Sequence, residues 1–439
     1  MKKMSRIITT ILLVPILCWC LAAPAAAGSS EELLSQLQSL KAKLEELEKK
    51  VAAQDRALAA QEKMVTKHAE EIKKQEEINA GLEGIKEALS GIEIGADITM
   101  IGQGTTDDDD VLGYENGTDA SFSFDLEVSK SFSWDGQASI VLEGGDGEGI
   151  DGRIDSWSAF NDDNDDDETA HVTEAWYEQN LFEGKFTFTI GKIDLTNYFD
   201  ANEVANDETF QFLSSGFVNN LAVAFPDNGP GLRATVSPSE LLDISIGWLA
   251  TDEDSGDSSW DDIGRGSFVI GEVDVKPVFA ELPGNYRFFA WYLNANLAEW
   301  DGSDDDESAK GFGFSFDQQL IKDVLTVFAR AGWQDEELFE LDAHYSAGLQ
   351  LAGSYWNRPD DVVGLAYGCA TISDDYKDFN RGNGDDDIDD DEHHVEIYYR
   401  WVFNEHLALT ADYQWLANPT GNSDADNVSV FGLRTQVDF

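Results

Sequence analysis

The chain has 439 residues, and its 86 Asp and Glu outnumber its 29 Lys and Arg to give a formal net charge of −57. This sign argues against nucleic acid as a partner, because phosphate binding needs the opposite charge. Of the three cysteines, Cys18 and Cys20 lie near the N-terminus in a segment expected to be removed. Only Cys369 then remains, so no intramolecular disulfide is expected.

Residues 1–27 have the features of a secretory signal peptide. Lys2, Lys3 and Arg6 form a basic start, and an apolar run from Ile7 to Leu21 follows. Ala25 to Ala27 then offer a small-residue cleavage site. The apolar run is short for a bilayer-spanning helix. We therefore expect an exported protein that, if it enters a membrane, does so through strands.

Residues 28–90 predict a periplasmic coiled coil. The region lacks Pro and aromatic residues and is rich in Ala, Leu, Glu, Lys and Gln, which are good helix formers. Apolar residues from Leu37 to Ile72 recur at alternating steps of three and four when Gln54, Gln61 and His68 are counted as polar core positions. Such polar layers fix the number of helices in a coiled coil, and we expect a trimer. A single helix that folds back on the next domain is the alternative.

Residues 91–439 predict a transmembrane β-barrel. Apolar and polar residues alternate with period two in many segments, of which Phe122 to Val128 and Val428 to Phe439 are examples. Charged residues occur in mid-strand on the polar face, where a sandwich core would exclude them. Short turns alternate with long acidic connections. At roughly 22 residues per strand and loop, we expect an all-β antiparallel barrel of about 16 strands.

Several motifs follow one another between Val172 and Phe439. Thr173 to Gln179 precedes Ile190 to Asp194, and Phe328 to Trp333, Arg358 to Gly368 and Phe431 to Thr435 come later. In this order and spacing they resemble the carbohydrate-selective porins of the OprB family, with Lys192 where the family usually has Arg. A last strand that ends on Phe also resembles the closing strand of outer-membrane barrels.

The resemblance implies an outer-membrane porin of a Gram-negative-type bacterium, trimeric, that admits sugars or similar small polar solutes by passive diffusion. A coiled coil ahead of such a barrel also resembles the porins of cyanobacteria, some of which are proposed to admit inorganic ions including iron. Those porins carry an S-layer-homology domain before the coil. The present chain shows none, so cell-wall anchoring by that route is not expected.

Strand parity selects charged side chains that would point into the barrel and line the pore. These candidates are Asp125, Glu127, Glu174, Arg233, Asp243, Arg330, Glu396, Arg400, Asp412 and Arg434. Lys192 and Asp194 are further candidates, although they would turn outward unless a bulge at Gly191 re-aims them. Each of these side chains could instead brace the wall. Arg287 shares the parity of Phe289, Trp291 and Leu293, so we expect it at the membrane interface.

Two kinds of connecting segment attract attention. The span from Asp200 to Gly231 is rich in Phe without clean alternation, and we expect part of it to fold into the lumen and set the constriction. Acidic runs elsewhere predict solvated outer loops that enrich cations at the mouth. They could also hold loosely bound divalent cations. Weak candidates for such ligands are Asp162, Asp163, Asp165, Asp385 and Asp387.

The favoured function is passive diffusion of small hydrophilic solutes, with carbohydrates first. One alternative is a porin for cations or inorganic ions such as iron, and another is a structural tether that links the outer membrane to a periplasmic partner through the coil. The scattered histidines suggest no catalytic group, and neither an enzyme activity nor a cofactor beyond loosely bound cations is expected.

Overall fold

The computed structural model describes residues 30–164, 169–302, 307–384 and 387–439. It separates into two units, residues 1–90 and residues 91–439. The predicted signal peptide and the metal-ligand candidates Asp165 and Asp385 lie outside the described residues. In the described part, no helix combines the length and apolarity needed to cross a bilayer.

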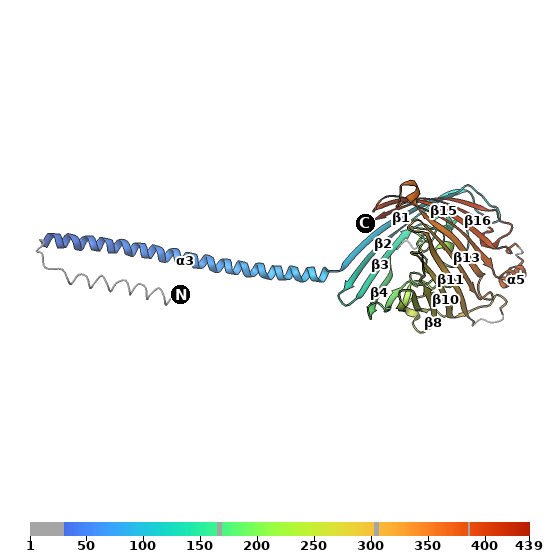
Figure 1. Cartoon of the computed structure of the whole chain (residues 1–439), viewed down its shortest axis with the longest axis horizontal. Helices are drawn as coiled ribbons and strands as arrows, with labels where there is room; N and C mark the ends of the chain where they lie inside the picture. The colour runs from blue at the N-terminus through green and yellow to red at the C-terminus, as the bar shows by residue number, and fades with distance from the viewer. Residues whose placement is uncertain (1–29, 165–168, 303–306, 385–386) are drawn as a thin grey trace. The chain divides into compact units, whose positions relative to one another are not determined.

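The first unit contains one long helix, α3 (Ser30–Leu89), of 60 residues (Figure 1). A helix was predicted here from the same absence of Pro and aromatic residues. It ends before Gly91, whose φ of +74° is the left-handed conformation that terminates many helices. The apolar residues of the expected heptad, such as Leu37 and Leu44, are exposed on α3. The structure contains a single chain, so the predicted coiled coil stays a prediction.

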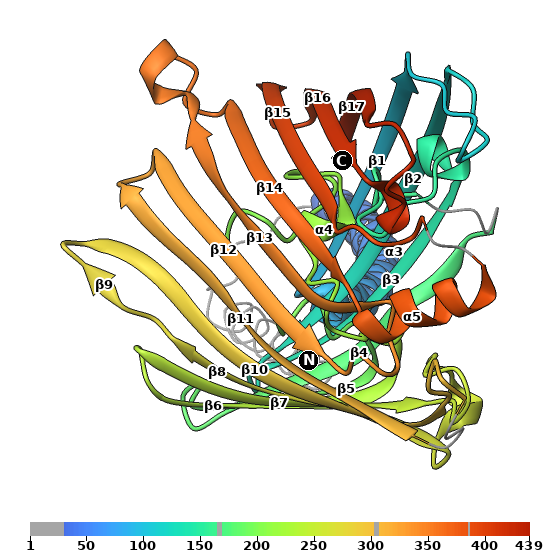
Figure 2. The ribbon, with the colours of Figure 1, turned by 90° about the vertical axis from the view of Figure 1, so that its right-hand side faces the viewer.

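The second unit is one antiparallel sheet that closes on itself (Figures 1 and 2). Its strands are β1 (Ile92–Thr105), β2 (Gly117–Phe132), β3 (Gly136–Asp146), β4 (His171–Leu181), β5 (Phe186–Ile193), β6 (Gly229–Ser239), β7 (Leu242–Thr251), β8 (Gly266–Val275), β9 (Val278–Phe279), β10 (Leu282–Leu297), β11 (Glu307–Ile321), β12 (Leu325–Gln334), β13 (Leu341–Ala352), β14 (Val362–Ile372), β15 (Glu392–Asn404), β16 (Leu407–Ala417) and β17 (Val428–Asp438).

Sixteen of these strands form the wall, because the two-residue β9 only lengthens the hairpin between β8 and β10. The barrel closes where β17 pairs with β1, from Asp438 opposite Asp97 to Val430 opposite Thr105. Closure leaves no sheet edge with unpaired N–H and C=O groups in hydrocarbon. The expected fold class and strand number are confirmed.

Strand connections differ in length at the two ends of the wall. One end has short turns, such as residues 133–135 and 240–241, and the other has long segments, such as residues 147–170 and 373–391. The remaining helices lie in these connections. They are α4 (Ser215–Val218), α5 (Asp374–Asn383) and the 3₁₀ turns η1 (Gly149–Gly152), η2 (Trp260–Asp262), η3 (Gly353–Trp356) and η4 (Pro419–Gly421).

The outward face of the wall is apolar, as the alternation predicted. Phe431 and Leu433 on β17 are 55% and 50% exposed, while Arg434 between Leu433 and Thr435 is 1% exposed. Exposed apolar side chains of this kind suit contact with lipid, and aromatic residues such as Trp401 suit its boundary. The buried side of the same strands therefore faces the lumen.

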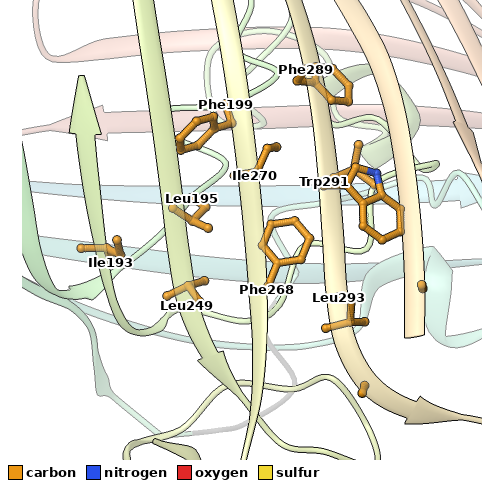
Figure 3. Close-up of a cluster of buried hydrophobic side chains, with 12 residues drawn as sticks. Ile193, Leu195, Phe199, Leu249, Phe268, Ile270, Phe289, Trp291 and Leu293 are labelled. Carbon is orange, nitrogen blue, oxygen red and sulfur yellow. The ribbon is translucent and has the colours of Figure 1, made fainter. Parts of the chain in front are cut away.

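Two of the three apolar clusters lie inside the barrel, between the wall and the segment of residues 194–228, here called the inner loop, and the third packs against the connections that contain Tyr114 and Phe160. Leu195 and Phe199 of the inner loop pack against Phe268 and Ile270 of β8 and Trp291 of β10 (Figure 3). In Figure 2, α4 of the same loop lies within the ring of strands. A solvent-filled lumen needs no such core, so these contacts serve to hold the loop in place.

Arg287 corrects one sequence-based expectation. It was expected at the membrane interface with Phe289, Trp291 and Leu293, but all four side chains point inward and are 3–9% exposed. Arg287 Nη1 donates to Asp317 Oδ2 at 2.7 Å. On β10 the inward face is apolar because it packs against the inner loop, so the rule that apolar residues face lipid fails there.

Candidate functional site

The inner loop folds into the barrel. It runs from the end of β5 to the start of β6 and crosses to the opposite wall, where it contacts β11, β12, β15 and β17. Phe212 and Phe217 are fully buried against Phe328 and Tyr398 of the wall. Burying each Phe side chain contributes about 1.5–3 kcal/mol. The expectation that part of residues 200–231 lies in the lumen is thereby confirmed.

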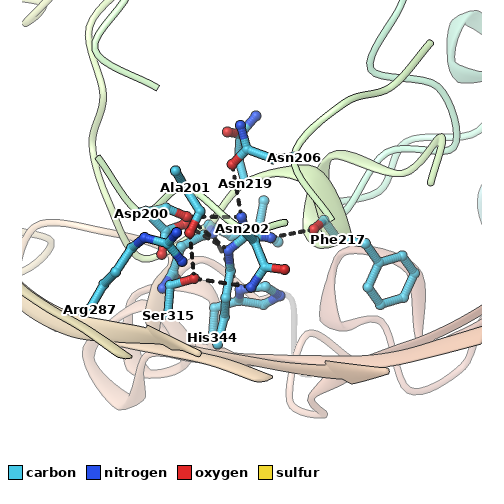
Figure 4. Close-up of polar contacts among 12 residues, drawn as sticks. Asp200, Ala201, Asn202, Asn206, Phe217, Asn219, Arg287, Ser315 and His344 are labelled. Carbon is cyan, nitrogen blue, oxygen red and sulfur yellow. Dashed lines mark hydrogen bonds and ion pairs between the residues drawn. The ribbon is translucent and has the colours of Figure 1, made fainter. Parts of the chain in front are cut away.

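Arg330 of β12 anchors the inner loop through Asp200, Asn206 and Phe217, three loop residues that are labelled in Figure 4. Its Nε lies 3.0 Å from Asp200 Oδ2, and its Nη1 donates to the carbonyl of Phe217 at 2.5 Å. Its Nη2 donates to the carbonyl of Asp200 at 2.9 Å and to Asn206 Oδ1 at 3.1 Å. One guanidinium fork therefore ties together three parts of the loop, as the planar arrangement of five donors allows.

Asp200 is held from a second side as well. Its backbone N–H donates to Glu272 Oε2 of β8 at 2.9 Å. Burial raises the pKa of the Asp200 carboxyl to about 6, and the neighbouring Arg330 and Arg287 act in the opposite direction. Asp200 is thus held between Arg330 and Glu272, two charged side chains with little exposure to solvent.

Glu396 and Arg434 anchor the middle of the inner loop. Glu396 of β15 accepts the backbone N–H groups of Leu213 and Ser214 at 2.7 and 3.1 Å. Arg434 of β17 donates to the carbonyls of Glu208 and Gln211, the latter at 2.8 Å. Asp412 is adjacent and 5% exposed. These three pore-lining candidates do point into the barrel, but the loop covers them.

The connection between β3 and β4 also enters the barrel. Gln103 donates to the carbonyl of Phe160 at 2.9 Å, and Ser123 Oγ lies 2.9 Å from Asp163 Oδ1. Burial raises the pKa of Asp163 to about 7. Burial, with the charge of Asp194, raises the pKa of Asp162 to about 6. The two candidates from this acidic run thus lie inside the barrel.

A buried Ser–His–Glu group joins this connection to β15. Ser158 Oγ is 2.8 Å from His394 Nδ1 and donates to Glu392 Oε1 at 2.6 Å. Glu392 also accepts the backbone N–H groups of Trp157, Ser158 and Thr420. Ser158, His394 and Glu392 are 1–4% exposed. Because the carboxylate contacts the serine rather than orienting the imidazole, the arrangement fixes two connections to the wall instead of resembling a catalytic triad.

Strands β1–β4 carry the carboxylates that solvent reaches. Glu127 is exposed, and Asp125 and Glu174 are half-buried. Ser139 Oγ donates to Glu127 at 2.7 Å, and Trp176 Nε1 donates to Glu174 at 2.9 Å. Sequence parity identified all three. It did not single out Asp97, Glu143 and Glu178, although Asp97 and Glu143 flank Asp125 in the sheet register.

The remaining charged candidates have partners in the barrel wall or in the inner loop. Arg233 pairs with Glu178 at 3.3 Å and lies 4.3 Å above the Tyr198 ring. Arg400 lies 5.0 Å from the centre of the Phe210 ring. Asp243 pairs with Lys276 at one end of the wall. Whether any of these side chains lines the conducting path stays a prediction.

Lys192 and Asp194 follow different courses. The register of β5 with β4 and β6 runs through Gly191 without a shift, so the bulge considered at this position is absent from these pairings. Lys192 stays opposite Ala175 and donates to the carbonyl of Val172 at 2.7 Å. Asp194 lies beyond the strand and accepts the backbone N–H of Thr196 at 2.8 Å. Gly191 has a φ of +151°, and a Cβ there would meet the Ala175 carbonyl oxygen at 2.2 Å.

The structure leaves the metal hypothesis untested. In residues 30–164, 169–302, 307–384 and 387–439, no group of three or more His, Cys, Asp or Glu side chains is arranged to hold a metal ion. Asp387 makes contacts of its own within the protein. Loosely bound divalent cations on the outer loops therefore remain a prediction.

A closed antiparallel barrel with an apolar outside, a polar inside and a connection folded into its lumen is an outer-membrane channel of the porin type. Residues 112–439 match the family model described as carbohydrate-selective porin, OprB family, and the chain belongs to this family. The resemblance noted in the sequence is confirmed. The family and the fold place the protein in the outer membrane.

The individual proteins that the chain resembles share little sequence identity with it. An uncharacterised protein of Aquifex aeolicus is 26% identical over 57% of this chain and 63% of its own length. Porin B of Pseudomonas aeruginosa is 26% identical over 36% of this chain and 42% of its own length. The chain thus spans less than two thirds of either relative. The structure of OprB from Pseudomonas putida superposes with a TM-score of 0.70 at 20% identity, covering 82% of this chain and 97% of the other.

Proposed function

We propose that the protein admits small neutral carbohydrates across the outer membrane by passive diffusion. The inner loop carries this proposal, because it occupies part of the lumen and contacts the inner wall at several points. Membership in the carbohydrate-selective porin family supports the choice of solute. The fold and family indicate a channel, and the absence of an enzymatic activity is part of the proposal. The comparisons favour neither ion uptake nor a purely structural role.

Sugar passage is tested by swelling of liposomes that contain the purified full-length protein. Glucose and a disaccharide such as maltose should enter faster than into protein-free liposomes, with glucose the faster of the two. Single-channel conductance in a planar bilayer, titrated with the same sugars, provides the second readout. Conductance without any sugar flux would contradict the proposal and favour the ion-uptake alternative.

We further propose that three copies assemble through α3. The support is the exposed apolar series on α3, in which Leu37, Leu40 and Leu44 are 58–66% exposed in one chain. An isolated helix with such a surface gains stability by packing against copies of itself. The alternative is that another periplasmic protein binds the exposed apolar surface of α3. If deletion of residues 31–90 leaves the trimers intact but impairs the integrity of the cell envelope, the result would favour such a partner and a role of the coil as a tether.

A further inference from the structure

The inner loop divides the charged side chains of the lumen into two groups with different exposure. The arginines on its far side are covered, since the side chain of Arg330 is 0% exposed and Arg434 is 1% exposed. Their guanidinium groups are engaged with loop carbonyls and with Asp200. Their positive charge is therefore largely withheld from a solute.

The carboxylates on β1–β4 remain accessible to water. In the sheet register Asp97 lies directly opposite Asp125, and Asp125 lies directly opposite Glu143. Glu127, two residues from Asp125 on the same face, is exposed. Like charges directly across a strand pair are destabilising unless water or counter-ions screen them. Three such carboxylates in one row, each half-buried, favour a hydrated path beside them.

The loops that face this wall carry the same sign. Asp163 lies close enough to Asp125 and Glu143 to feel their charge, and Asp194 does so with Glu174. Two arginines act near this side: Arg233 is paired with Glu178, and the charge of Arg434, which is engaged with the inner loop, also reaches Asp163. A low-dielectric passage lined on two sides by carboxylates concentrates cations and repels anions.

We propose that the conducting path runs along β1–β4 and that its carboxylates, with Asp125, Glu127 and Glu143 as the determinants, give the channel a charge preference. The inference rests on the proposed sugar function and refines the solute class. Neutral sugars and amine-bearing sugars pass readily, whereas uronic acids and sugar phosphates pass more slowly. Amino-sugar ammonium groups replace the counter-cations of the carboxylate row and can donate hydrogen bonds to it.

The wild-type protein provides the first test and needs no variant. In a tenfold KCl gradient the reversal potential should report a preference for K⁺ over Cl⁻ of roughly tenfold, the enrichment expected for a cleft of one charge sign. In the liposome assay glucosamine should enter at least as fast as glucose, and glucuronate several-fold more slowly. Equal rates for glucosamine and glucuronate, or anion selectivity, would overturn the inference.

Matched variants locate the determinant. The triple variant Asp125→Asn, Glu127→Gln, Glu143→Gln should lower the K⁺ preference by at least about half and narrow the difference between the charged sugars. The control Asp254→Asn, Asp257→Asn, Asp261→Asn removes the same charge from the exposed connection between β7 and β8. At 1 M KCl, where screening acts over about 3 Å, the control should match the wild type.

The outcomes separate the inference from the function on which it rests. A control variant that loses as much selectivity as the lumen variant would overturn the inference, because the outer loops would then set the preference. Glucose flux without any charge discrimination would also overturn it and leave the sugar function standing. Absence of glucose flux in the wild-type protein would overturn both.

Discussion

At the scale of single residues, Arg330 shows how a loop is kept inside a barrel. Its guanidinium forms an ion pair with the Asp200 carboxylate and donates to three further loop acceptors, while its side chain has no exposed surface. Replacement by Met would leave Asp200, which is 2% exposed, as a buried unpaired charge. Removing one partner of a buried pair costs about 3–5 kcal/mol.

Arg330→Met should therefore lower the temperature at which the folded barrel converts to its heat-modified form on a gel. The same variant should make the inner loop more sensitive to added protease. Arg265→Met is the matched control, because Arg265 pairs with Asp252 in an outer connection with a side chain that is 53% exposed. Such surface pairs contribute about 0–1 kcal/mol. Equal effects of the two substitutions would show that Arg330 is not an anchor.

Asp163 should make the stability of the barrel depend on pH. Burial raises its pKa to about 7, above the value of about 3.9 expected in the unfolded chain. A raised pKa means that the folded state favours the protonated carboxyl, so its contribution to stability is present below pH 4 and is lost as the pH rises through 7. Asp163→Asn should then raise the thermal midpoint more at pH 8 than at pH 5. Asp254→Asn, on an exposed loop, should change neither midpoint, and a pH-independent effect of Asp163→Asn would contradict the assignment.

Residue alternation predicted which side chains share a face but could not always decide which face is inside. On β17 the apolar face was correctly placed toward lipid. On β10 the same rule placed Arg287 and Trp291 outward, whereas both point inward because Leu195 and Phe199 pack there. Those partners lie far away in the sequence, so no local pattern announces them. For the same reason parity found Arg330 but not its partners Asp200 and Asn206.

At the scale of elements, the inner loop acts as an insertion held at several independent points. The apolar contacts of Phe212 and Phe217, the Glu396 bonds and the two arginine anchors are distributed over half the wall. Its Phe-rich composition and lack of alternation indicated that it is no ordinary turn. Its path was not predictable, because each anchor comes from a different strand.

Deletion of residues 209–220 should raise the single-channel conductance, since it removes α4 and the bulk of the loop that faces the wall. The sugar block should weaken in the same variant. Removal of the loop also uncovers Arg330, Glu396 and Arg434, so we expect reduced thermal stability. Arg434→Met removes two loop contacts without shortening the chain. This variant should give a noisier current and a smaller rise in single-channel conductance than the deletion. A deletion variant that folds but conducts like the wild type would exclude this segment as the constriction.

At the scale of the whole molecule, the barrel and α3 differ in whether their own chain completes their structure. The barrel satisfies its own backbone by closure, but α3 exposes its apolar series along a helix of 60 residues. The heptad, with Gln54, Gln61 and His68 at core positions, was readable from the sequence because helical periodicity is local. The number of helices that associate depends on how side chains of several chains pack, and one chain does not contain that information.

The trimer proposal makes a prediction that involves the full protein. Purified wild-type protein should migrate as a trimer without heating and should open in groups of three equal conductance steps. A variant without residues 31–90 should lose much of this association while each barrel still conducts, because the fold of residues 91–439 closes without α3. Leu37→Asn, Leu44→Asn should weaken trimers in the full chain, whereas Glu46→Gln, Lys50→Gln, which removes an exposed ion pair on the same helix, should not. Trimers of undiminished stability after deletion of α3 would mean that the barrels associate through their own walls and that the helix serves another partner.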